Sequence, residues 1–170
     1  MKDNKGFTLV ETLVTVGLLS VIGLIISGVL FVTLRSGGKA ELEMAGKQKG
    51  EFALNSLEKM IRGAKEIKDI TTRCSPAGVT DDSITLIGQD DLETTLTCAG
   101  TSIASSSANS TTLLQGVTTL DCDQFITCVR TEPQKPLVTI DFTIGLGSAT
   151  AQPDKRAEIH FTSKVSMRNY

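Results

Sequence analysis

The sequence predicts an α+β protein in which a long N-terminal helix precedes an antiparallel β-sheet domain packed on the helix's second half. Three observations predict this fold. Residues 13–34 form an apolar run without a charged side chain, and residues 53–67 carry apolar side chains at helical spacing. Beyond Cys74 the apolar residues follow the two-residue period of strands. At 170 residues, the chain is long enough for one globular domain and an appended helix.

The composition argues against several classes of function. With 17 basic and 19 acidic residues the net charge is −2, so no basic face indicates a nucleic-acid partner. The only histidine is His160, and no two cysteines stand in a C-x-x-C pair, so a zinc site is not predicted. No phosphate-binding glycine loop and no Ser-His-Asp arrangement stands out. The sequence therefore predicts neither an enzyme nor a cofactor.

The apolar N-terminal run is long enough to cross a membrane. As a helix, its 22 residues span roughly 33 Å at about 1.5 Å per residue, which covers a bilayer core. An ordinary secretory signal is a poor match, because the run is too long and no small-residue cleavage site follows it. An uncleaved membrane anchor remains open from these features alone.

Glu11 is the only charged residue between Phe7 and Leu34. A carboxylate in lipid costs about 2.5–3.5 kcal/mol near the bilayer centre and less near the interface, a cost from which a plain anchor gains nothing. If the chain is cut after Gly6, the new α-amine of Phe7 in a neighbouring copy could pair with Glu11. In a low dielectric this pair would favour one axial offset between copies.

Residues 5–11, KGFTLVE, resemble the processing site of type IV prepilins and type II secretion pseudopilins, and the likeness continues through the apolar helix. The resemblance implies cleavage after Gly6 by a prepilin peptidase, N-methylation of Phe7, and polymerisation with other pilin subunits through the helix. It also implies an inner-membrane assembly platform as partner. The protein would be a single-pass cytoplasmic-membrane protein, surrounded by lipid before assembly and later part of an extracellular or periplasmic filament.

Two further segments, 57–64 (LEKMIRGA) and 165–169 (VSMRN), resemble minor pilins of the pseudopilin J or PilW type, which implies a tip or initiation subunit. The expected divisions are a leader at 1–6, a transmembrane helix at 7–34, its amphipathic continuation at 35–70 and a β-rich domain at 71–170. The alternative function is an uncleaved, membrane-tethered binding or adhesin domain. The type of filament stays open.

Gly37 and Gly38 raise two possibilities for the segment between the apolar run and the domain. Each glycine costs a helix about 1 kcal/mol relative to alanine, and Gly46 and Gly50 add to this cost. The segment could be a loop, but we expect one long, bent helix from about Phe7 to about Ile67.

Alternating or Thr-rich segments predict the strands, and Ser/Thr-rich segments predict the loops. The loops are expected at Thr101–Thr112, as an exposed segment, and at Gly145–Asp154, as a hairpin loop. The strands are expected at 84–86, 92–98, 113–120, 125–129, 138–144 and 157–167.

Four cysteines predict two disulfides formed in an oxidising compartment, with free thiols as the alternative. Three pairings are possible, and we favour Cys74 with Cys98 and Cys122 with Cys128, the latter closing a short loop.

Several polar features have weaker implications. The acidic groups Asp81-Asp82, Asp90-Asp91 and Asp121/Asp123 lack the spacing of a Ca²⁺ loop, which favours solvated turns. Residues 109–111 match a glycosylation sequon in a predicted exposed stretch.

Overall fold

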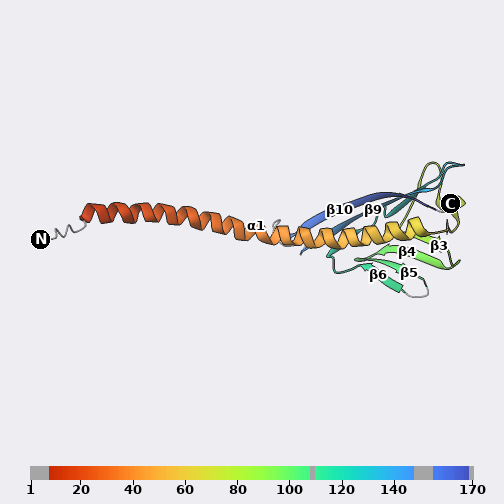
Figure 1. Cartoon of the computed structure of the whole chain (residues 1–170), viewed down its shortest axis with the longest axis horizontal. Coiled ribbons are helices and arrows are strands. Elements are labelled where there is room, and N and C mark those ends of the chain that lie inside the picture. Colours follow the sequence, from red (N-terminus) through yellow and green to blue (C-terminus); the bar gives the residue numbers. More distant parts are fainter. Residues whose placement is uncertain (1–7, 108–109, 148–154, 169–170) are drawn as a thin grey trace. The chain divides into compact units, whose positions relative to one another are not determined.

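The computed structural model describes residues 8–107, 110–147 and 155–168, and the chain divides into two compact units, Met1–Gly38 and Lys39–Tyr170. One long helix and a set of antiparallel strands make up the fold, which confirms the predicted α+β class (Figure 1). In chain order the elements are α1 (Leu9–Gly63), β1 (Glu66–Ile67), α2 (Ile70–Arg73), β2 (Val79–Asp81), β3 (Ser83–Ile87), β4 (Glu93–Ala99), β5 (Ser102–Ser106), β6 (Ser110–Leu114), β7 (Thr119–Asp121), β8 (Ile126–Val129), β9 (Leu137–Leu146) and β10 (Ala157–Ser166).

Helix α1 is continuous through Gly37 and Gly38, so the alternative of a loop between anchor and domain is wrong. The helix ends at Gly63, earlier than the predicted end near Ile67. The chain leaves the helix there because the backbone N–H groups of Lys65 and Lys68 donate to carbonyls of β3, at 2.8 and 2.9 Å. Ile67 is fully buried, as its helical spacing suggested, but it lies on β1.

Two antiparallel sheets, rather than the single expected meander, pack with the second part of α1. One sheet has the order β1-β3-β4-β5-β6, and the other has the order β10-β9-β8-β2 with β7 also paired to β9. In Figure 1 the yellow part of α1 runs between β9–β10 on one side and β4–β6 on the other. The helix therefore buries side chains against both sheets. The apolar face seen in the sequence predicted packing on a sheet but not the presence of a second one.

The core of the second unit joins the helix to both sheets. Ala53, Leu57 and Ile61, one helical face of α1, are completely buried. The alternating residues of β9 point inward, and β9 pairs with β10 along ten residues, as the sequence alternation predicted. Phe142 on β9 stacks on Phe161 of β10 with ring centroids 5.2 Å apart.

Gly46 and Gly50 allow β10 to lie directly against α1. A Cβ atom at Gly50 would be 2.1 Å from Cζ of Phe161, and one at Gly46 would be 2.6 Å from Cδ1 of Ile159. Such distances are far below van der Waals contact, so only glycine permits this packing. The two glycines therefore reduce helix propensity but are required by the contact between helix and sheet.

The Ser/Thr-rich segment predicted as an exposed loop at Thr101–Thr112 instead contains β5 and the start of β6. Ile103 is completely buried and Ser105 is buried beside it, two residues along the same inward face of β5. The Ser105 hydroxyl donates to the carbonyl of Thr111 at 3.4 Å. Strand pairing provides hydrogen-bond partners for these polar residues, whereas composition alone predicted that they would be exposed to solvent. Asn109 of the sequon lies outside the described residues.

All four cysteines form disulfides, so free thiols are excluded, but the favoured pairing is wrong. Cys74 is bonded to Cys128, with Cα atoms 4.7 Å apart. The short loop between Cys122 and Cys128 had favoured a bond between these two residues. Instead, β2 pairs with β8, and this pairing brings the segment after α2 beside Cys128. Ser75 forms an isolated bridge with Val129 at the same place.

The second disulfide joins the two sheets. Cys98 lies on β4 of one sheet, and Cys122 follows β7, which pairs with β9 of the other. Their Cα atoms are 5.9 Å apart. No local pattern reveals this link, because it depends on how the two sheets face each other.

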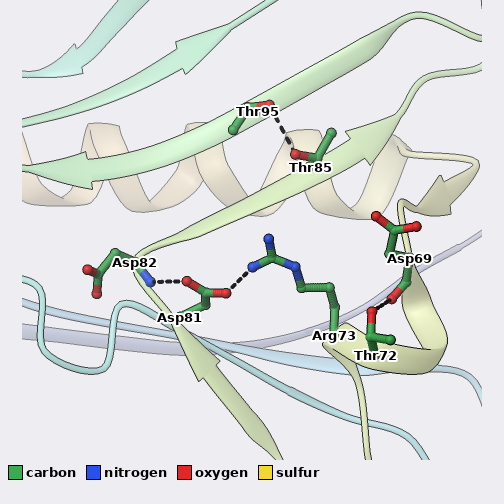
Figure 2. Close-up of polar contacts among 7 residues, drawn as sticks. All are labelled: Asp69, Thr72, Arg73, Asp81, Asp82, Thr85 and Thr95. Atoms are coloured by element: carbon green, nitrogen blue, oxygen red, sulfur yellow. Dashed lines mark hydrogen bonds and ion pairs between the residues drawn. The ribbon is translucent and has the colours of Figure 1, made fainter.

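Polar contacts fix α2 and the corner at which the chain passes from β2 of the second sheet to β3 of the first. Arg73 of α2 forms an ion pair with Asp81, whose other oxygen accepts the backbone N–H of Asp82 at 3.0 Å (Figure 2). Across β3 and β4, the hydroxyls of Thr85 and Thr95 lie 3.0 Å apart. These contacts hold the α2 turn and the β2–β3 corner in place.

Two lysines after α1 pair with the hairpin that joins β3 and β4. Lys65 forms an ion pair with Asp91, and Lys68 forms one with Glu93 at 2.8 Å. The hydrogen bond to Asp91, with the attraction of its charge, raises the pKa of Lys65 above its ordinary value. The hydrogen bond to Glu93 raises the pKa of Lys68 in the same way.

Candidate functional site: the N-terminal helix

Residues 9–34 of α1 expose their apolar side chains instead of burying them. The large apolar side chains of this segment are 51–80% exposed. Within the described residues, α1 is the one helix long and apolar enough to cross a membrane, and its most apolar window has a mean hydropathy of 2.5 with none of it buried. Such a surface is stable only in lipid or against other protein surfaces.

Four hydroxyl groups of this segment donate to carbonyls inside the helix. Thr12 and Thr15 donate to carbonyls three residues earlier, both at 2.9 Å. Ser20 and Thr33 donate to carbonyls four residues earlier, both at 2.8 Å. A hydroxyl bonded in this way adds little cost in an apolar surrounding. These four hydroxyl-bearing residues therefore do not oppose burial of the helix in lipid.

Glu11 lies in the first turn of α1, where its charge is favourable to the helix dipole. The Thr8 hydroxyl accepts the backbone N–H of Glu11 at 3.3 Å, and the Thr8 carbonyl accepts that of Thr12 at 3.2 Å. Thr8 is thus the N-cap of the helix. The Thr-x-x-Glu spacing at 8–11 is a capping pattern that the sequence analysis missed, although it is visible in the sequence.

The Glu11 carboxylate is exposed, and no described residue forms an ion pair with it. The predicted cleavage residues Gly6 and Phe7 lie outside the described residues. The structure therefore describes the helix from its N-cap onward and places the Glu11 carboxylate three residues after Thr8, without an ion-pair partner in the described part of the chain.

The other polar residues considered in the sequence form ordinary surface contacts. His160 is exposed on β10, and its Nε2 lies 2.7 Å from Oδ1 of Asp141. The Asp121 side chain accepts the backbone N–H of Asp123 at 3.0 Å, as in an Asx turn. Among the described residues, no three His, Cys, Asp or Glu side chains are grouped to hold a metal ion.

An exposed apolar helix followed by an α+β unit with two disulfides defines a class of protein: one with an N-terminal assembly or membrane-spanning helix and a separate folded domain. Its apolar helix is compatible with a single-pass membrane anchor.

Residues 1–31 match the family model described as the prokaryotic N-terminal methylation motif. This motif is the signature of type IV pilins and pseudopilins, so the predicted resemblance of the N-terminal segment is confirmed. The motif favours a structural role. No curated protein and no solved structure shows significant similarity to the chain.

Proposed function

We propose that the chain is a structural subunit of a type IV pilus or a type II secretion pseudopilus. A prepilin peptidase cuts it after Gly6, Phe7 is N-methylated, and the subunit is polymerised through its N-terminal helix. The methylation motif at residues 1–31 supports this proposal. The observation that carries it is the helix of residues 9–34, whose apolar side chains are exposed on every side.

Assembly transfers this helix from lipid to the filament. Leaving the bilayer would expose its apolar side chains to water, so they must be reburied against the helices of other subunits. Glu11 carries the one charge of residues 9–34. The α-amine of Phe7 from a neighbouring copy is the partner we assign to it, and this pair sets the axial offset between subunits.

The role of Glu11 is tested by Glu11→Ala. The variant should still be cut after Gly6, because the scissile bond is intact, but it should enter filaments poorly. The measurements are N-terminal sequencing and the amount of subunit in sheared filaments. Glu41→Ala, which removes an exposed carboxylate from the same helix outside the apolar segment, is the matched control. Normal incorporation of Glu11→Ala would refute the register role.

Cleavage is tested by intact mass and N-terminal sequencing of the exported protein. The wild-type chain should begin at Phe7 with a methylated amine, and Gly6→Ser should retain the leader. If the wild-type chain begins at Met1 in cells with a working peptidase, the protein is an uncleaved, membrane-tethered domain.

The likeness of residues 57–64 and 165–169 to minor pilins favours a tip or initiation subunit. These segments lie together, since the backbone N–H of Arg168 donates to the carbonyl of Arg62 at 3.3 Å. Labelling the subunit along isolated filaments tests the assignment. Label at one end supports a minor subunit, and uniform label contradicts it.

A further inference from the structure

We propose that the outer face of the second part of α1 is a docking surface for the apolar segment, residues 9–34, of a second copy of this chain. The surface is a strip of exposed, uncharged side chains: Met44, Gln48, Phe52 and Asn55. All four belong to the second unit. The inference rests on the polymerisation in the proposed function, because it needs two copies side by side, but not on the tip assignment.

The composition of the strip differs from that of an ordinary solvated helix face. Its residues follow one another at steps of three or four positions, so they lie along one side of the helix over about 16 Å. Glu41 precedes them and Lys59 follows them on the same line, but the four positions between carry no charge. The face of a helix opposite the core is normally charged or polar. A strip with two large apolar side chains and no charge departs from that pattern.

Met44 and Phe52 are exposed on the side of α1 opposite the core. Their side chains are 67% and 64% exposed, whereas Leu57 on the inner face is completely buried. The structure describes two other exposed large apolar side chains in this unit, Leu92 and Leu137, and neither lies on a helix. Covering the strip would remove an aromatic ring and a methionine side chain from water, so the strip gains from a partner.

A hollow of about 380 Å³ beside Phe52 can receive side chains of the partner. It lies between α1 and β6, and it is lined in part by Leu113 and Leu114, which are largely buried. Lys49 is the charged residue on its wall, and the Lys49 amine donates to the carbonyl of Gly116 at 3.1 Å. The hollow therefore extends the apolar surface beyond the Phe52 ring.

The apolar segment of a second copy fits this strip by its chemistry. Its large apolar side chains are 51–80% exposed, and they need protein cover once the helix leaves lipid. The uncharged strip supplies cover without removing charges from water, a cost that the charged sides of the same helix would impose. The segment also contains Gly17, Gly23 and Gly28, where an added Cβ would meet nothing within 4 Å. Glycine allows close approach of a second helix, which leaves room for the Phe52 ring.

The strip is too small to hold two copies together by itself. It is about 16 Å long and about 10 Å wide, which is far below the roughly 800 Å² per partner of a stable interface. The strip should therefore be covered inside a filament, where other contacts between copies add to it. It should be uncovered in the isolated chain.

The test places the photoreactive residue benzoylphenylalanine at Phe52 of the full chain, in cells that also make a copy with a different C-terminal tag. Irradiation of sheared filaments should link position 52 of one copy to residues 9–34 of the other, as located by mass spectrometry. The link should be lost when the chain is dispersed in detergent. The matched control carries the same photoreactive residue at Leu92, which is also apolar and exposed, and should give no such link.

A variant tests the energetic role of the strip. Phe52→Asp should lower the amount of subunit in sheared filaments roughly tenfold, because it places an unpaired carboxylate against an apolar helix. Thermal unfolding of the second unit should not change, since the wild-type side chain is mostly exposed. Leu92→Asp makes the same substitution at another exposed apolar position and should enter filaments as the wild type does.

The outcomes separate this inference from the proposed function. If the wild type assembles but position 52 links to lipid or to other parts of a copy, or if Phe52→Asp assembles normally, the docking surface is wrong and the proposed function stands. A link to a different protein overturns the assignment to a second copy. If the wild-type chain enters no filament, both the docking surface and the proposed function are refuted.

Discussion

The apolar side chains of residues 9–34 lie on the surface of a helix, whereas those of the second unit are enclosed between a helix and two sheets. Leu, Ile and Val make up more than half of residues 9–34, whereas in the second unit they are interleaved with polar residues and form a minority. The first region has a continuous apolar surface on which four hydroxyls are bonded internally. The second has apolar residues on one face of each element and is closed by two disulfides. The density of apolar residues and their distribution around the element therefore together determine whether a region needs an external partner.

The largest expected effect comes from separating the two regions. Residues 39–170, exported without residues 1–38, should fold with both disulfides and be absent from the membrane fraction, because every buried core residue lies beyond residue 52. Membrane fractionation and intact mass under non-reducing conditions would measure this. Aggregation of the fragment, or its retention in membranes, would show that the two regions are not independent.

Removing a disulfide should strongly destabilise the second unit. The Cys74–Cys128 bond spans 54 residues and the Cys98–Cys122 bond spans 24. If the bonds act by restricting the unfolded chain, the corresponding double serine variants should lose about 4 and about 3.5 kcal/mol. Denaturant unfolding would measure both losses. An equal or reversed order would show that sheet contacts, not loop closure, dominate.

Helical glycines should respond differently in the two regions. Gly50→Ala should destabilise the second unit by about 1–3 kcal/mol, because the new methyl group meets the Phe161 ring. Gly28→Ala should leave the thermal unfolding of that unit unchanged, since a Cβ there meets nothing within 4 Å. Gly63→Ala, also open, is the control within the second unit. If Gly50→Ala does not destabilise the second unit, in the wild-type background or together with Phe161→Leu, the packing between Gly50 and Phe161 is not as close as described.

The smallest effect concerns the lysine pairs after α1. The folded-state pKa values of Lys65 and Lys68 are raised from 10.5, so the pairs stabilise the fold fully below that pH and lose this contribution as the pH rises through the raised values. The denaturation midpoint of Lys65→Ala/Lys68→Ala should be slightly below that of the wild type at about pH 8, and the difference should shrink as the pH rises through the raised pKa values of the two lysines. A difference that persists at high pH would assign it to packing of the lysine stems.

The elements with strong periodicity could be predicted from the sequence. The alternation at 138–144 and 157–167 gave β9 and β10, and the apolar run gave the exposed half of α1. β5 was missed because serine and alanine surround its one large apolar residue, Ile103. The end of α1 was misplaced because Ile67 fits both a helical stripe and a buried strand, and only its pairing with Leu86 decides between them.

The candidate site divides in the same way. Glu11 could be selected from the sequence, because a single carboxylate in an apolar membrane-spanning run has a free-energy cost that a partner would offset. The close contact of Gly50 with Phe161 could not be predicted, since these residues are more than a hundred positions apart in the chain. It depends on β10 lying against α1 in one direction, which the glycines at 46 and 50 permit.

The sequence by itself determined the apolar helix, the methylation motif and the presence of strands, because each depends on residues that are neighbours in the chain. Only the tertiary structure decided the cysteine pairing, the two separate sheets and the close approach of β10 to α1. These features depend on contacts between distant segments. Their free energies are set by strand pairing and close packing, which local residue patterns do not encode.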